Sequence, residues 1–228
     1  EVVVMARDET KLQEVVAQLD HSQGQNHDYL VVDFSDYEAF SKKIKAFFTE
    51  NRIDILINNT QGPPAGGALE KGIDDYQRAF DLLFKCAVYC TTLALSHMQE
   101  QCWGRIINVS SLEGKHGKPG VSIYVTAKHA INGFTKSCAQ EIGTTGVTIN
   151  CICPGAIETD IMRDEGPAAA ASMGLTYQGL LDWFASEAAI KRLNTCEEVA
   201  AVASLLASEA GAGITGSMIS VDGGTAAY

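Results

Sequence analysis

The feature that most constrains the fold is a regular alternation of apolar, strand-like runs with amphipathic helical segments. The runs are apolar at consecutive positions, which is typical of strands that are buried on both faces. We expect strands at residues 1–6, 29–33, 53–57, 105–109, 147–152 and 218–221. Because strands that alternate with helices form parallel sheets covered on both sides, the sequence predicts an α/β fold with a doubly wound parallel sheet.

Helical segments fill the intervals between these runs. Asp8 can cap a helix that ends near Leu19. Capping boxes begin at Ser35 and Thr195, because a Glu stands three positions after each. Longer helices are expected over residues 73–101 and from Tyr124 to about Ile142. No linker or repeat interrupts the pattern, so we expect one domain over residues 1–228.

Composition excludes several classes of function. The net charge of −11 and the isoelectric point of about 4.8 leave no basic surface for nucleic acid or an anionic membrane. The seven cysteines have no metal-binding spacing, and we interpret them as reduced thiols of a cytoplasmic protein without a metal site. No uncharged apolar run of about 18 residues suggests a membrane span.

The chemistry is expected where the strands end. Parallel sheets bind ligands beyond the carboxyl ends of their strands, and Ser111 follows one such end. Tyr124 and Lys128 are four residues apart at the start of a helix and therefore share a face. The ammonium would lower the pKa of the phenol and make it an acid or base. Alternatively, Tyr124 and Lys128 are only a surface pair.

Four motifs then occur in order along the whole chain. They are Ser111 with Tyr124 and Lys128 in the spacing Ser-x12-Tyr-x3-Lys, Asn58-Asn59, the segment 147–155 with Ile157 and Thr159, and residues 214–224. Together they resemble the short-chain dehydrogenase/reductase family, near its ketoreductase and secondary-alcohol dehydrogenase branches. The resemblance implies a Rossmann-like fold and a homodimer or homotetramer.

The resemblance also implies a reaction and a set of roles. The activity would be hydride transfer between NADP(H) and a ketone or secondary alcohol, for example a 3-oxoacyl, polyketide or sugar carbonyl. Tyr124 would donate the proton, Ser111 would bind the same oxygen, and Lys128 would lower the Tyr124 pKa and hold the nicotinamide ribose. By the same resemblance, Tyr124, Lys128, Asn59, Ile157 and Thr159 would contact the cofactor.

The choice of cofactor depends on the end of the first strand. Ala6 and Arg7 stand where NAD enzymes of this type usually have an acidic residue. Arg7 suits a 2′-phosphate, so NADP(H) is preferred and NAD(H) remains possible through Asp8. Asp33 and Phe34 would flank the adenine by resemblance, although Asp33 could instead bond the next turn.

Three departures from the family pattern affect the expected activity. The Gly-rich turn and the strand before it are missing, so we expect an N-terminally incomplete chain whose sheet lacks one strand. Leu83 replaces an Asn that helps to hold a relay water, and Gln61 replaces a Gly beside the cofactor. These departures leave one alternative open, a catalytically silent cofactor-binding or scaffold protein.

The segment 154–193 is expected to be largely irregular and partly helical, and the family resemblance implies that it forms a lid over the substrate. Its apolar side chains include Met162, Trp183 and Phe184, which suit a partly apolar substrate. The alternative is that these side chains pack in the core or at a subunit interface.

Overall fold

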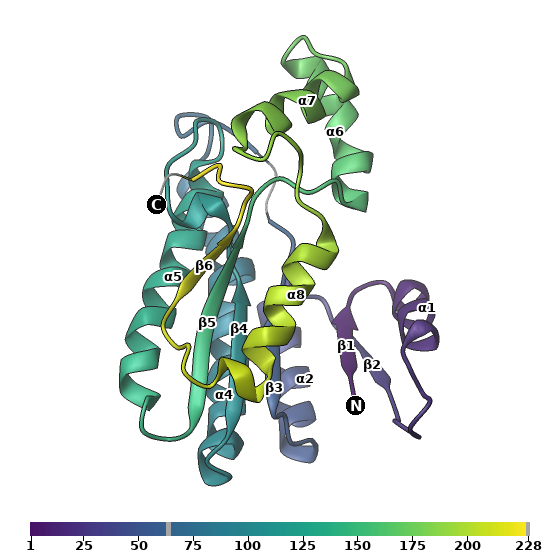
Figure 1. The fold of residues 1–228 in the computed structure, drawn as a ribbon, viewed down its shortest axis with the longest axis vertical. Helices are drawn as coiled ribbons and strands as arrows, with labels where there is room; N and C mark the ends of the chain where they lie inside the picture. Colours follow the sequence, from purple (N-terminus) through teal and green to yellow (C-terminus); the bar gives the residue numbers. More distant parts are fainter. Residues whose placement is uncertain (63–64, 227–228) are drawn as a thin grey trace. The chain divides into compact units, whose positions relative to one another are not determined.

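The computed structural model describes residues 1–62 and 65–226, which form two compact units, Glu1–Arg52 and Ile53–Tyr228. Each unit is an α/β arrangement of parallel strands with helices (Figure 1). This confirms the predicted Rossmann-like α/β class. The expectation of one domain over residues 1–228 stays a prediction.

The first unit contains a two-stranded parallel sheet. Strand β1 (Val3–Ala6) pairs with β2 (Asp28–Val31), and the helix α1 (Glu9–Gln18) connects them. The side chain of Asp8 accepts a hydrogen bond from the Lys11 amide, as the capping prediction requires.

The helix α2 (Tyr37–Glu50) follows in the first unit, and its predicted cap is wrong by one residue. Asp36, not Ser35, accepts the hydrogen bond from the Ala39 amide. The Ser35 hydroxyl instead donates to Asp33 at 2.7 Å and lies in the turn before the helix. Phe40, which is fully buried, anchors the inner face of α2.

The second unit is built on a four-stranded parallel sheet in the order β3 (Ile55–Asn58), β4 (Gly104–Val109), β5 (Val147–Pro154) and β6 (Met218–Val221). All predicted strands are present to within a few residues, and β5 continues two residues further than expected. The strands form two sheets instead of one, because no strand in the described residues pairs with both β1 and β3.

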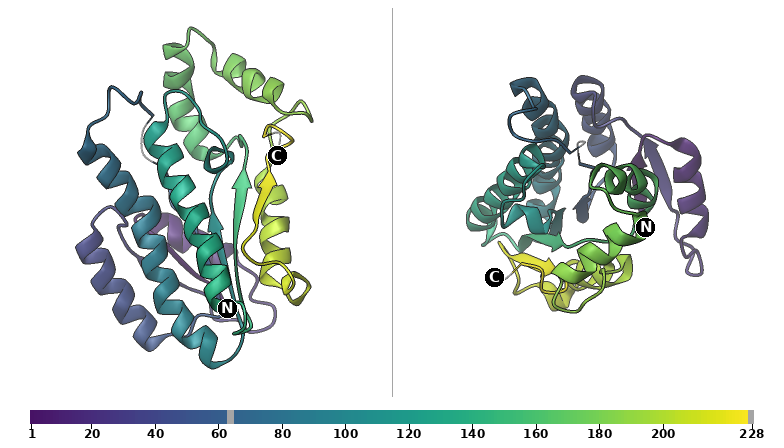
Figure 2. Two further views of the ribbon diagram at one scale, coloured as in Figure 1. Left: turned by 90° about the vertical axis from the view of Figure 1, so that its left-hand side faces the viewer. Right: turned by 90° about the horizontal axis from the view of Figure 1, so that it is seen from above.

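Helices cover both faces of this sheet. Figure 2 shows α4 (Cys86–Glu100) and α5 (Ser122–Ile142) on one face and α8 (Cys196–Ala207) on the other. Thr195 and Glu198 form the predicted capping box of α8 reciprocally. Between α8 and the sheet lie Ile107, Ile152 and Leu206, which are buried from water and join the two layers.

The long helix predicted over residues 73–101 contains an irregular turn. It consists of α3 (Ile73–Phe80), a π-helical turn (Asp81–Lys85) and α4. Leu83 lies in the π-helical turn and is 3% exposed. Such turns widen the backbone locally and are frequent at functional sites. A buried Leu therefore occupies the position for which the family resemblance expects an Asn.

The segment after β5 is more regular than expected. Two helices, α6 (Asp160–Ser172) and α7 (Tyr177–Glu187), lie beyond the carboxyl ends of β4 and β5 at the top of Figure 1. Each begins at a Thr whose hydroxyl accepts a hydrogen bond from a backbone amide, Thr159 and Thr176. These caps explain why an Ala- and Gly-rich segment becomes helical.

The helical segment Ile73–Glu100 is long and apolar enough to cross a membrane by length and composition alone, so the expectation of no membrane span stays a prediction. In the structure this segment packs on the sheet and on α5, where Phe84 and Phe134 meet edge to face at 6.1 Å. We interpret it as a packing helix of the α/β unit.

Two neighbouring leucines on α8 allow a test of this core. Leu206 is 1% exposed, whereas Leu205 is 43% exposed. We expect Leu206→Ala to lower the free energy of unfolding by about 2–5 kcal/mol, because it removes buried methyl groups and leaves a cavity. Leu205→Ala is the matched control and should change it by less than about 0.5 kcal/mol. Urea unfolding of both variants measures the difference, and equal losses would contradict the packing described here.

Candidate active site

The parallel register brings the ends of the central strands together. Asn58 on β3 lies beside Asn108 on β4, which in turn lies beside Cys151 on β5. The Asn58 amide donates to Asn108 Oδ1 at 2.8 Å, and the Asn108 amide donates to the Thr135 hydroxyl of α5 at 2.9 Å. This buried network satisfies polar groups that would otherwise destabilise the core, and it ties the sheet to α5.

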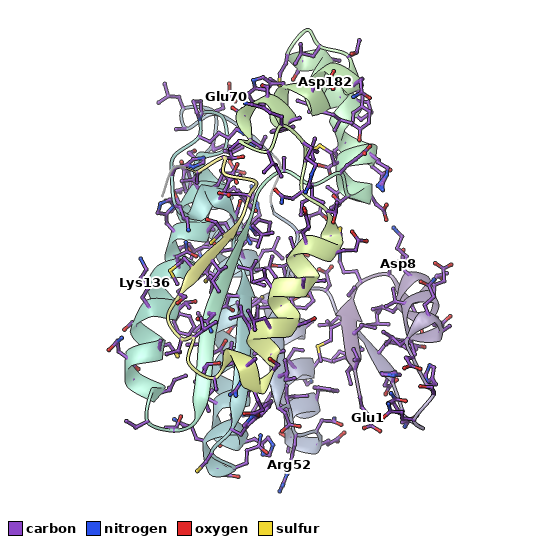
Figure 3. The ribbon with its side chains drawn as sticks, viewed as in Figure 1. Glu1, Asp8, Arg52, Glu70, Lys136 and Asp182 are labelled. Carbon is purple, nitrogen blue, oxygen red and sulfur yellow. The ribbon has the colours of Figure 1, made fainter. Side chains whose placement is uncertain are left out.

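Lys128 lies one turn of α5 beyond Tyr124, as predicted. Its ammonium donates a hydrogen bond to the carbonyl oxygen of Val109 at 2.7 Å and is 5.5 Å from the centre of the Tyr124 ring. Lys128 is 4% exposed, whereas Lys136, labelled in Figure 3, lies on the exposed side of the same helix. Tyr124 and Lys128 are therefore not a surface pair.

Ser111, Tyr124 and Lys128 come together at the end of β4. Ser111 follows β4 and begins a short 3-10 turn, Leu112–Gly114, which the Asn132 amide holds through the Gly114 carbonyl at 2.8 Å. The Ser111 hydroxyl influences the pKa of Tyr124, and Ser111, Tyr124 and Lys128 line the same cavity. The structure therefore places a phenol, a hydroxyl and an ammonium around one point.

The expected lowering of the Tyr124 pKa is wrong for this structure. Burial raises the pKa of Tyr124 to about 12, although the neighbouring Ser111 hydroxyl opposes this rise. Burial also lowers the pKa of Lys128 to about 8, because a desolvated ammonium is costly. Tyr124 thus keeps its proton at neutral pH, as a proton donor must.

A cavity of about 920 Å³ opens beside these groups. Its walls come from the ends of β3, β4 and β5, from the loop before α5, and from α6 and α7. Six predicted site residues line it, namely Ser111, Tyr124, Lys128, Asn59, Ile157 and Thr159. The predicted lid residues Met162, Trp183 and Phe184 line it as well.

The other three predicted cofactor residues belong to the first unit. Arg7 and Phe34 follow β1 and β2, and the positive charge of Arg7 helps to lower the pKa of Asp33. The main cause of that lowering is Ser35, which donates to Asp33 from its hydroxyl and its amide. The side chain of Asp33 thus bonds the next turn, which was the alternative considered from the sequence.

Two charged residues of the loop before α5, Glu113 and Lys118, line the cavity and were not predicted. The carboxylate of Glu113 accepts a hydrogen bond from the Ser111 hydroxyl. Lys118 lies 3.9 Å from Glu113 and 3.8 Å from Glu187 of α7, and its ammonium stacks 5.0 Å from the Trp183 ring. The sequence held only a weak signal for them, their place in the loop between Ser111 and Tyr124.

Gly62 contacts the ring of Tyr124 closely. A Cβ atom at this position would lie 2.7 Å from the ring, so a larger residue would displace the phenol. Gln61, which replaces the expected Gly, extends instead toward Glu165 of α6 at 3.4 Å.

Comparison with known proteins identifies the family. A family model described as enoyl-(acyl carrier protein) reductase matches residues 1–226. The D-beta-hydroxybutyrate dehydrogenase of Rhizobium meliloti (strain 1021) is 35% identical over 75% of this chain and 67% of its own length. The meso-2,3-butanediol dehydrogenase of Serratia marcescens is 35% identical over 86% of this chain and 74% of its own length. The chain belongs to the short-chain dehydrogenase/reductase family.

A solved structure is similar over nearly the whole chain. It is a variant of the actinorhodin polyketide ketoreductase, determined with NADPH. It has a TM-score of 0.88 and 27% sequence identity, and the match covers 99% of this chain and 87% of that one.

The buried ammonium of Lys128 makes stability depend on pH. Its pKa is about 8 in the folded protein and 10.5 in the unfolded chain, so the unfolded chain holds more protons between these values. Between pH 8 and pH 10.5 this group therefore makes the folded state more stable as the pH rises, by up to about 1.4 kcal/mol per pH unit.

The variant Lys128→Met removes this contribution, so the free energy of unfolding of the native protein should rise relative to the variant across that window. Denaturant unfolding at several pH values measures the difference, most clearly in the lower part of the window, below the ordinary Tyr pKa of 10.0 at which Tyr124 begins to contribute. A difference that stays constant with pH would contradict a desolvated Lys128.

Proposed function

We propose that this protein transfers a hydride between NADP(H) and a ketone or secondary alcohol, with Ser111, Tyr124 and Lys128 as its catalytic residues. The observation that carries the proposal is the convergence of these three groups on a cavity at the carboxyl ends of the strands. The named dehydrogenases and reductases among its relatives support an enzyme over a silent cofactor-binding or scaffold protein.

The arrangement suits reduction of a carbonyl group. Bound nicotinamide supplies the hydride. Tyr124 is protonated at neutral pH and donates its phenolic proton to the oxygen on which negative charge develops. Ser111 donates a second hydrogen bond to that oxygen, and Lys128 stabilises the phenolate that remains. In the oxidative direction Tyr124 accepts the proton instead.

The residues of the cavity fit a dinucleotide that bears ribose hydroxyls. Lys128 and Thr159 offer donors toward them, and Asn59 and Ile157 complete this part of the wall. Arg7 is exposed after β1 and offers a guanidinium for a 2′-phosphate. The NADPH in the structure of the related ketoreductase supports NADP(H) as the cofactor, with NAD(H) as the alternative.

The protein is expected to act in the cytoplasm as a homodimer or homotetramer. Only 39% of the most apolar window of Ile73–Glu100 is buried within one chain, and a second copy could cover the rest. The seven free cysteines support a reducing compartment.

Replacement of the proposed acid tests the reaction directly. Tyr124→Phe removes the phenolic proton but keeps the ring against Gly62. We expect it to lower kcat by about 100-fold or more, since general acid catalysis contributes at least this much. Loss of nicotinamide absorbance over a panel of ketones measures the rate, and NADPH binding by fluorescence checks that the variant is folded. A variant that keeps most of the rate would show that Tyr124 is not the acid.

Cofactor choice has a separate test. Arg7→Ala should raise KM for NADPH by about 10-fold, because it removes a charge-assisted contact to the 2′-phosphate. KM for NADH should stay within about twofold, since NADH has no phosphate there. Parallel titrations with both cofactors give the comparison. Equal effects on both would place Arg7 outside the cofactor site.

A further inference from the structure

Glu113 presents a carboxylate to the cavity beside the proposed catalytic groups. One of its oxygens accepts the hydrogen bond from the Ser111 hydroxyl, and the Glu113 amide donates back to the Ser111 oxygen at 3.2 Å. Its side chain is 15% exposed, and its charge contributes to the raised pKa of Tyr124. Only the Ser111 hydroxyl therefore separates this carboxylate from the expected position of the substrate carbonyl oxygen.

This contact occupies the only proton of the Ser111 hydroxyl. A hydroxyl has one proton to donate, so Ser111 cannot donate to Glu113 and to a substrate carbonyl together. A carboxylate, by contrast, has about four acceptor positions, so Glu113 can also accept a hydrogen bond from a substrate hydroxyl. With this second donor, Glu113 stays hydrogen-bonded when the Ser111 hydroxyl turns its proton toward the carbonyl oxygen.

The charges around Glu113 indicate a neutral donor. The ammonium of Lys118 already lies between the carboxylates of Glu113 and Glu187, at 3.9 and 3.8 Å. The two carboxylates outnumber this one ammonium, which disfavours an acidic group on the substrate. Because a cation is already present beside both carboxylates, a neutral hydroxyl fits the remaining acceptor positions of Glu113.

We propose that Glu113 makes the enzyme selective for substrates with a hydroxyl on the carbon next to the reacting carbonyl, that is, α-hydroxyketones and the vicinal diols formed from them. This inference rests on the proposed function. In the reduction, NADPH gives a hydride to the carbonyl carbon and becomes NADP⁺, while Tyr124 gives its proton to the oxygen. The neighbouring hydroxyl binds Glu113 and is unchanged.

The test compares two substrates that differ in this hydroxyl, acetoin and butanone. We expect the native protein to have a kcat/KM for acetoin at least about 10-fold above that for butanone, as a hydrogen bond to a charged group can provide. Glu113→Leu should reduce this ratio to about 1, because it lowers kcat/KM for acetoin more than kcat/KM for butanone.

Matched variants separate selectivity from structural damage. Glu113→Gln keeps the size of the side chain and should reduce the ratio partially. Glu187→Gln removes the other carboxylate beside Lys118 and should keep the ratio within about twofold. Equal loss of rate for both substrates in Glu113→Leu would overturn the inference, because that is the result of a role limited to holding the loop.

A second measurement needs no turnover. Ligand-observed NMR compares butane-2,3-diol with butan-2-ol on the native protein and on Glu113→Leu, in the presence of NADP⁺. We expect stronger binding of the diol by the native protein alone. If the protein binds the diol selectively through Glu113 without reducing any ketone, the proposed function fails, and the binding preference that the inference predicts still stands. If it reduces both ketones equally and binds both alcohols equally, the inference fails and the function stands.

Discussion

The hydrogen bond from the Lys128 ammonium to the Val109 carbonyl determines the arrangement of the site. A buried ammonium is costly unless it is well bonded, and here it donates at 2.7 Å to the last residue of β4. This bond fixes α5 against the end of the central strand, and it thereby places Tyr124 beside Ser111. The cost of desolvation appears in the pKa of Lys128, which falls to about 8. A site that must hold a charge ready for a reaction therefore accepts a local loss of stability.

A network of polar side chains near this hydrogen bond explains how polar groups can be accommodated at the carboxyl ends of the strands. Asn58, Asn108 and Thr135 lie at or behind the strand ends, where apolar residues would pack more simply. The Asn58 amide is bonded across strands and the Asn108 amide is bonded to α5, so these polar groups favour one register for the sheet. That register brings the ends of β3, β4 and β5 to one level. The cavity forms where they end because α6 and α7 cover that edge.

The strands could be predicted from the sequence because Val and Ile at consecutive positions have few alternatives to a buried parallel strand. Ser111, Tyr124 and Lys128 could be predicted as a group. Helix geometry places Tyr124 and Lys128 on one face, and the parallel topology places Ser111 at the end of its strand. Competition between alternative hydrogen-bond partners of one side chain was harder to predict. Ser35 fits a helix cap, but its hydroxyl bonds Asp33, a contact that depends on the turn. The pKa of Tyr124 depends on burial, which residue spacing does not contain.

Glu113 and Lys118 show what lies beyond the reach of sequence patterns. Their contacts join a loop to a helix about 70 residues further along the chain, and only the folded structure brings them together. The Lys118 ammonium pairs with Glu187 and lies 5.0 Å from the Trp183 ring and 4.9 Å from the Phe184 ring. One ammonium thus connects the loop that carries Ser111 to α7. Each of these contacts is weak where water reaches it. Acting together on a partly buried group, they hold the loop that carries Ser111 against α7, and this contact closes one side of the cavity wall.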